Sequence, residues 1–255
     1  MTRIVLALAQ RALRNALRRP QYLAPLIIFP SLFLAVNTGG LERTTELPGF
    51  PDVRGFLDFQ LSAAITQSLL IGGVQAGIAQ ALEIEGGFFD RLATSPIPRT
   101  AIVFGRVLAT VPLALFQVAA FLVIGLAFGA HIEGGWAGVA LVLLIGSVAG
   151  AGFAAIGVAL ALRARNASLV QGIFPIAFVV LFLSSAFFPR DLLSAPASWI
   201  AAYNPLSYIA EGMRNPIIAS ISSEAVLEGL AAAAGLLGVM VGISIAALRG
   251  RLREA

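Results

Sequence analysis

The chain has 255 residues, without any cysteine or lysine and with a single histidine, His131. The absence of cysteine excludes disulfides, thiolate metal sites and a cysteine nucleophile. One histidine cannot form a multi-histidine metal site, so we expect no metal site. Without lysine, the chain cannot form the phosphate-binding loop GxxxxGK[ST], whose lysine reaches the β- and γ-phosphates. Any ATP that the protein uses must therefore be bound by another chain.

Charged residues are also scarce. They make up 12% of the chain, whereas hydrophobic residues make up 58%, and the mean hydropathy is +0.91. Soluble domains carry about 25% charged residues, so this chain cannot cover the surface of a water-soluble globule. Disorder is excluded too, because it requires low hydrophobicity and high charge. The composition predicts a polytopic membrane protein.

Six apolar runs are candidates for membrane spans, since a helix needs about 20 residues to cross ~30 Å of hydrocarbon. They do not alternate apolar and polar residues as barrel strands do, so we expect an all-α fold with one transmembrane domain over residues 1–255. The predicted spans are Tyr22–Val36, Phe56–Ala81, Ala101–Ala130, Gly138–Leu162, Leu169–Phe188 and Ala225–Leu248.

The arginines indicate the orientation. With six spans both termini lie on one side, and every arginine except Arg43, Arg54, Arg190 and Arg214 belongs to that side. Cytoplasmic loops carry the excess of basic residues, so we place both termini in the cytoplasm and the protein in the cytoplasmic membrane. The sequence pI of about 10.6 then reflects topology and contact with anionic lipids, with no nucleic-acid partner expected.

Residues 1–20 are predicted to form an amphipathic helix on the inner membrane surface. Arg3, Arg11, Arg14 and Arg18 share one helical arc, opposite small apolar residues. A signal peptide with residues 22–36 as its apolar core is the alternative. It is disfavoured because this stretch contains two prolines and no convincing small-x-small cleavage site follows it.

The segment 83–99 follows the second predicted span and carries several charges. Gly86 and Gly87 should break the helix that leaves the membrane, and we expect a short amphipathic helix from Phe88 to Thr94. The segment is either a solvated turn with interfacial aromatic residues or a docking helix for a cytoplasmic partner.

The segment 189–222 is predicted to lie at the outer interface or to dip into the membrane. Asn204 and Pro205 have the pattern of an N-cap followed by proline at the first helical position. The Asn215–Pro216 pair is expected to end that helix near Arg214, because the residue before a proline disfavours the helical conformation. A helix with these bounds is too short to span.

Two motifs resemble those of the ABC transporter type-2 permeases, the membrane subunits of exporters such as daunorubicin-type drug efflux systems. The first is E-x-E-x-G…R-L-x-x-S-P-x-x-R, which here comprises Glu83, Glu85, Gly86, Arg91, Leu92, Ser95, Pro96 and Arg99. The second is an outer segment that comprises Pro196, Trp199, Asn204, Pro205, Leu206, Tyr208 and Arg214. One departure is Arg106, where the family commonly has lysine after glycine.

The resemblance implies that residues 83–95 include a coupling helix, which sits in a cleft of a separate ATP-binding subunit. Phe88 would lie on the apolar face of this helix. Glu85 and Arg91 would face the partner. The resemblance also implies two ATP-binding subunits, a second copy of this permease or a related one, and no ATPase site in this chain. The implied substrate is a hydrophobic drug-like molecule or a lipid, with polysaccharide or ion export as the alternative.

Four glutamines lie within the predicted spans: Gln60, Gln67, Gln75 and Gln117. They either form hydrogen bonds between helices or line a polar path for the substrate. No acidic or basic residue lies at the middle of a span, which argues against a proton-coupled carrier. A stand-alone carrier or channel remains the alternative function. Three GxxxG motifs, beginning at Gly73, Gly146 and Gly238, permit close contacts between helices.

Overall fold

The computed structural model describes residues 1–253, and all regular elements in this part of the chain are helices. The predicted all-α fold is confirmed. The elements are α1 (Thr2–Leu17), α2 (Pro20–Leu41), η1 (Glu42–Glu46), α3 (Phe56–Glu85), α4 (Phe88–Ala93), α5 (Thr100–Ala127), α6 (Gly135–Ala164), α7 (Ala167–Gly172), α8 (Phe174–Phe182), η2 (Arg190–Leu192), α9 (Ala197–Tyr203), α10 (Pro205–Ile218) and α11 (Ser223–Arg251).

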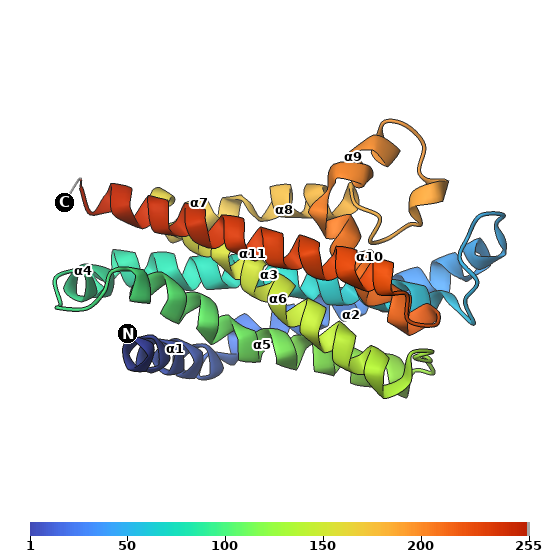
Figure 1. Cartoon of the computed structure of the whole chain (residues 1–255), viewed down its shortest axis with the longest axis horizontal. Coiled ribbons are helices and arrows are strands. Elements are labelled where there is room, and N and C mark those ends of the chain that lie inside the picture. Colours follow the sequence, from blue (N-terminus) through green and yellow to red (C-terminus); the bar gives the residue numbers. More distant parts are fainter. Residues whose placement is uncertain (254–255) are drawn as a thin grey trace.

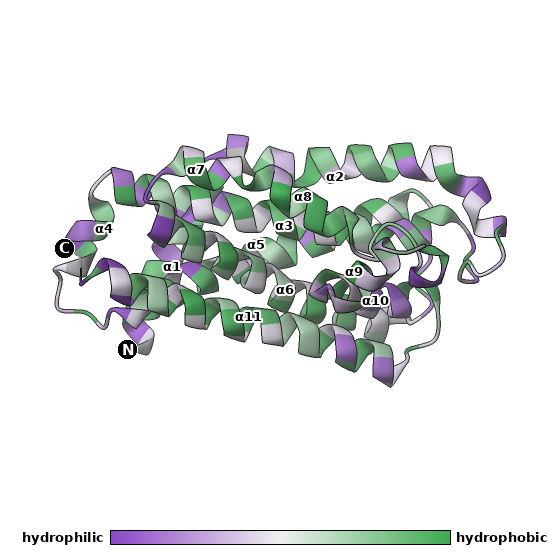
Figure 2. Cartoon of the chain, turned by 90° about the horizontal axis from the view of Figure 1, so that it is seen from above, coloured by the Kyte–Doolittle hydropathy of each residue, from purple (hydrophilic) through white to green (hydrophobic). Residues whose placement is uncertain are grey.

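The long helices run along one common direction (Figure 1), and hydrophilic residues are concentrated toward the two ends of the bundle (Figure 2). Five helical stretches are long and apolar enough to cross a membrane. They are Leu23–Glu46, Phe56–Glu85, Thr100–Ala127, Gly135–Ala164 and Ser223–Arg251. The protein is therefore a polytopic membrane protein. Pro25 and Pro30 lie inside α2 without ending it, as is common in membrane helices.

The fifth predicted span differs from the other five. Instead of one helix over Leu169–Phe188, α7 and α8 form a shorter apolar stretch, Ala167–Phe182, with a break at Ile173. Pro175 lies at the start of α8 and has no backbone N–H, so it cannot continue the hydrogen bonds of α7. At 1.5 Å per residue the stretch is shorter than the ~30 Å hydrocarbon layer.

Helix α3 lies at the centre of the bundle, where it packs against α2, α5, α6 and α10. Helices α3 and α6 approach closely where the backbone of Gly157 in α6 lies against the backbone of Gly73 and Gly77 in α3. Close van der Waals packing of this kind, with hydrogen bonds and lipid entropy, drives helix association in a bilayer, where apolar burial has little effect.

Both termini and α4 lie at one end of the bundle, while η1 and α9 lie at the other (Figure 1). The predicted N-terminal helix is present as α1, which lies across the bundle and packs on α5. Ala9 and Ala12 are buried against Ala109, while Arg3, Arg14 and Arg18 are exposed. Three arginines of the predicted arc are thus exposed, whereas the fourth, Arg11, is half-buried and pairs with Glu83.

Helix α10 begins as predicted but ends later. Pro205 is at its start, and the Asn204 side chain caps it by accepting the N–H of Leu206 at 3.0 Å. The predicted end near Arg214 is wrong, because α10 continues through Pro216 to Ile218. The carbonyls of Pro216 and Ile217 accept the N–H groups of Gly134 and Glu133, so tertiary contacts hold the last turn.

Candidate functional sites

Helix α4 protrudes at the end of the bundle that holds both termini (Figure 1). Gly86 caps α3, and Gly87 has a φ of +69°, a left-handed conformation that suits glycine and turns the chain into α4. Phe89 is fully buried, whereas Asp90 and Arg91 are exposed. The helix is thus anchored by an aromatic residue and presents a charged outer face.

Two arginines from the ends of the chain attach α4 to the bundle. Arg251 of α11 pairs with Asp90, with 3.1 Å between Nη2 and Oδ1, and its guanidinium lies 4.5 Å from the centre of the Phe89 ring. Arg11 of α1 lies 3.5 Å from the centre of the Phe88 ring. Movement of α4 would therefore act directly on α1 and α11.

Glu83 connects three helices. One carboxylate oxygen is 2.9 Å from Nη1 of Arg11 in α1, and the other is 2.8 Å from Nη2 of Arg106 in α5. Arg106 also donates from Nε to Oε1 of Gln80 at 2.9 Å. Glu83 therefore faces its own bundle, although it belongs to the predicted docking segment. Arg106 keeps the positive charge at the position where the sequence departs from the common lysine.

The other predicted docking residues divide into exposed and inward-facing groups. Arg91, Pro96 and Arg99 are exposed, as is Glu85, whose Oε1 accepts the N–H of Ala167 at the start of α7 at 2.8 Å. Three others are half-buried, namely Phe88, Leu92 and Ser95. The Ser95 hydroxyl donates to the Leu92 carbonyl at 2.6 Å. Spacing alone could not separate these groups, because α4 is too short to show a period.

A cavity of about 230 Å³ lies between α1, α2, α3 and α5, with Gly150 of α6 on its wall. Its walls are mainly apolar, and its polar groups come from α1, α3, α5 and Arg19, which precedes α2. Those groups belong to Arg11, Asn15, Arg19, Gln75, Glu83, Arg106, Thr110 and Gln117.

The four candidate glutamines do not share one surface. Gln75 and Gln117 both line the cavity, and Gln117 accepts the hydroxyl of Ser68 at 3.0 Å. Gln60 and Gln67 are buried and are not part of the cavity wall. Within the described residues, Oε1 of Gln60 and both polar side-chain atoms of Gln67 have no hydrogen-bond partner. The structure thus brings together two of the four.

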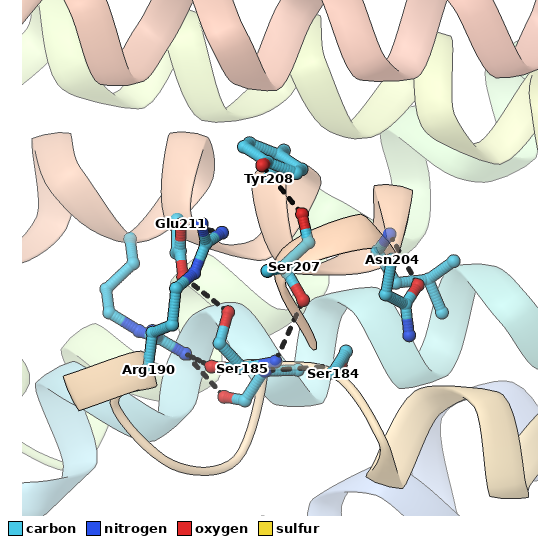
Figure 3. A network of polar contacts seen from close by, with 11 residues as sticks. Ser184, Ser185, Arg190, Asn204, Ser207, Tyr208 and Glu211 are labelled. Carbon is cyan, nitrogen blue, oxygen red and sulfur yellow. Dashed lines mark hydrogen bonds and ion pairs between the residues drawn. The ribbon is translucent and has the colours of Figure 1, made fainter. Parts of the chain in front are cut away.

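At the opposite end, a polar network joins η2, α10 and the turn after α8 (Figure 3). Glu211 accepts Nη2 of Arg190 at 2.9 Å and the hydroxyl of Ser185. The N–H of Ser185 donates to Oγ of Ser207 at 3.1 Å. Burial lowers the pKa of Arg190, but the Glu211 carboxylate and Tyr208 outweigh burial and raise that pKa above its usual value. Arg190 is therefore charged at neutral pH.

The residues of the predicted outer motif have separate structural positions. Asn204 donates from Nδ2 to the Val180 carbonyl at 2.7 Å, and Tyr208 donates its hydroxyl to the Ala202 carbonyl at 2.8 Å. Trp199 in α9 is 69% exposed. These contacts hold α8, α9 and α10 together and leave the indole at the surface.

Arg214 is buried and donates to three backbone carbonyls. Its Nε bonds the Phe59 carbonyl at 3.3 Å, and its Nη2 bonds the carbonyls of Ser185, at 3.0 Å, and Ala186. The guanidinium also lies 3.8 Å from the centre of the Phe59 ring. In the predicted outer motif, Arg214 was only the arginine that follows N-P-L-x-Y, and nothing in its spacing indicated that it would bind backbone carbonyls.

Comparison with known proteins agrees with this architecture. Residues 3–218 match the ABC-2 type transporter family. The chain belongs to the ABC-2 type transporter family. The resemblance seen in the sequence is thereby confirmed, and the chain is a membrane-spanning transport permease subunit.

Three proteins similar to this chain are also named as permeases. A putative transport permease ycf38 of Porphyra purpurea is 31% identical over 82% of this chain and 72% of its own length. The daunorubicin resistance ABC transporter permease protein DrrB1 of Streptomyces coeruleorubidus is 26% identical over 91% of this chain and 81% of its own. The corresponding ycf38 protein of Pyropia yezoensis is 28% identical over 82% of this chain and 72% of its own.

Proposed function

We propose that this ABC-2 permease moves a hydrophobic drug-like molecule or a lipid outward across the cytoplasmic membrane, powered by separate ATP-binding subunits that dock on α4. Two permease chains, identical or related, would work with two ATP-binding subunits that hold ATP and magnesium. The observation that carries the proposal is α4 itself. It is an exposed charged helix that is attached to the bundle at both of its phenylalanines.

The contacts of α4 supply a route for mechanical coupling. Closure of the ATP-binding subunits would displace α4, and Arg251 would pass this displacement to α11. Arg11 would pass it to α1, and Glu83 connects α1 to α5. Rigid-body movement of packed helices is an established way to transmit a local change.

The substrate class rests on two supports. The membrane-spanning helices offer apolar side chains together with amides such as those of Gln75 and Gln117, and the relative DrrB1 is named for daunorubicin resistance. Polysaccharide or ion export by the same ATP-driven mechanism is the alternative substrate class. A stand-alone carrier or channel is the alternative mechanism.

The test reverses the charge on the exposed face of α4. We expect Arg91→Glu to reduce ATP-dependent transport at least tenfold and to weaken copurification of the ATP-binding subunit, because Arg91 is exposed on the face of α4 where the partner would dock. Expression and thermal stability should stay unchanged. Arg43→Glu is the matched control, because Arg43 is an exposed arginine of η1 and lies outside α4.

Two results would contradict the proposal. Normal ATP-dependent transport by Arg91→Glu would remove α4 as the docking site. Transport by the purified chain alone, in vesicles without ATP, would favour a stand-alone carrier or channel.

A further inference from the structure

The cavity between α1, α2, α3 and α5 has a charged end and an apolar end. Arg11, Asn15 and Arg19 lie in or after α1, and Glu83 and Arg106 lie near the ends of α3 and α5 on that side. Further along α3 and α5, and on α2, the wall consists mainly of apolar residues, with Thr110 and the two glutamines. These apolar residues include Leu23, Leu26, Leu69, Leu113 and Ala114. The order of polar and apolar groups is that of an amphiphile.

The charge at this end is not balanced within the wall. Three arginines line the cavity, and Glu83 is the one carboxylate among its described lining residues. Glu83 pairs with Arg11 and Arg106, whereas Arg19 is exposed and has no ion pair among the described contacts. Arg106 is only 8% exposed, so a buried cation is held at the cavity wall. An anionic group would meet net positive charge here.

The size of the cavity restricts the ligand further. At about 230 Å³ it is smaller than the usual ~300–1,000 Å³ of sites for drug-sized molecules. It accommodates one apolar chain more readily than a set of fused rings. Because Arg19 at the charged end of the cavity is exposed, the anionic headgroup of a lipid in the surrounding leaflet would be attracted to it.

We propose that this cavity binds an anionic phospholipid, with the phosphate at Arg19 and Arg11 and one acyl chain along α3 and α5. The site is distinct from the α4 surface, and its occupancy does not depend on ATP. Arg106 and Glu83 hold the inner boundary of the headgroup region. The arginine charge selects the lipid, and the apolar walls hold its chain.

The test measures lipid binding to the purified full chain by native mass spectrometry, with phosphatidylglycerol and phosphatidylcholine of equal chain length as probes. We expect one tightly bound phosphatidylglycerol per chain and weaker phosphatidylcholine. Arg19→Gln should weaken phosphatidylglycerol binding about tenfold, the factor of one charge-assisted hydrogen bond. Arg14 is an exposed arginine of α1 that does not line the cavity, so Arg14→Gln should have little effect.

A second pair of variants tests the apolar part. Ala76→Leu fills the cavity and should abolish the one-to-one binding, whereas Ala119→Leu adds the same volume on the exposed face of α5 and should not. Should Ala76→Leu misfold, Ala79→Leu on the same wall replaces it. Equal binding of both lipids, equal effects of the two arginine variants, or unchanged binding after Ala76→Leu would each overturn the inference. None of these outcomes bears on ATP coupling through α4.

Discussion

At the scale of single residues, Arg214 shows how a buried charge can hold irregular backbone inside a membrane protein. The backbone of the turn after α8 is not helical. The Arg214 guanidinium donates hydrogen bonds to the carbonyls of Ser185 and Ala186 in this turn. A carbonyl without a donor costs more in hydrocarbon than in water, so one cation that serves three carbonyls stabilises this turn against α3 and α10.

We predict that Arg214→Ala lowers the free energy of unfolding by about 2–3 kcal/mol, because it leaves buried carbonyls without donors. Arg214→Lys should recover part of the loss, since an ammonium group keeps the charge but not the planar fork. Thermal unfolding in detergent measures both. The exposed Arg43→Ala serves as the control, and an equal shift in all three variants would contradict the assignment.

The roles of individual residues were harder to predict from the sequence than the family or the helices. The types and order of Glu83, Arg91 and Arg214 indicated the family, but not which of them faces the protein interior. Glu83 meets Arg11, which is 72 positions away, and such distant pairs leave no mark in local spacing. Gln67 and Gln75 lie near one helical face by their spacing, yet Gln67 is buried and Gln75 lines the cavity.

At the scale of elements, the three GxxxG motifs have different environments. Gly73, Gly77, Gly146 and Gly150 each leave no room for a side chain, while Gly238 and Gly242 have open space around them. The same sequence pattern therefore marks close contacts in two cases and none within this chain in the third. Only the packing of the whole bundle distinguishes them.

We predict that Gly157→Ala destabilises the protein by about 2 kcal/mol, because its methyl group would overlap the backbone of Gly73 and force α3 and α6 apart. Gly238→Ala should be neutral or stabilising by up to about 1 kcal/mol, since alanine favours helix. The midpoints of thermal unfolding in the same detergent provide the comparison. Equal destabilisation by both changes would show that the close contact is not what holds these helices.

Most element boundaries followed from sequence because hydrophobic length, glycine breaks and caps are local. Phe56 and the Gly86–Gly87 break bound α3 and α4 as predicted. The exceptions depend on distant contacts. Pro216 stays helical because the 133–134 turn binds the carbonyls of the last turn, and the expected fifth span is divided next to Pro175.

At the scale of the whole molecule, both termini and α4 lie at one end, with η1 and α9 at the other (Figure 1). The arginine bias predicts that the α4 end faces the cytoplasm. Since the chain contains no cysteine, single cysteines can report accessibility without removing native ones.

On intact cells, we expect a membrane-impermeant maleimide to label Asp52→Cys and Ser194→Cys. Thr94→Cys should react at least tenfold less until the cells are permeabilised. All three positions are exposed, so differences in labelling report the side of the membrane. Labelling of Thr94→Cys alone would invert the orientation, and equal labelling of all three would contradict a fixed topology.

The short α7–α8 stretch has a consequence for the surrounding bilayer. Its apolar length falls below the ~30 Å that its neighbours in the bundle cover, so hydrophobic mismatch arises on one side of the protein only. Lipids can relieve this mismatch by thinning locally, which would bring headgroups and water down toward Ser184, Ser185 and the Glu211–Arg190 pair. The energetic cost of this deformation grows with acyl chain length, so membrane thickness becomes a variable that acts on this side of the permease.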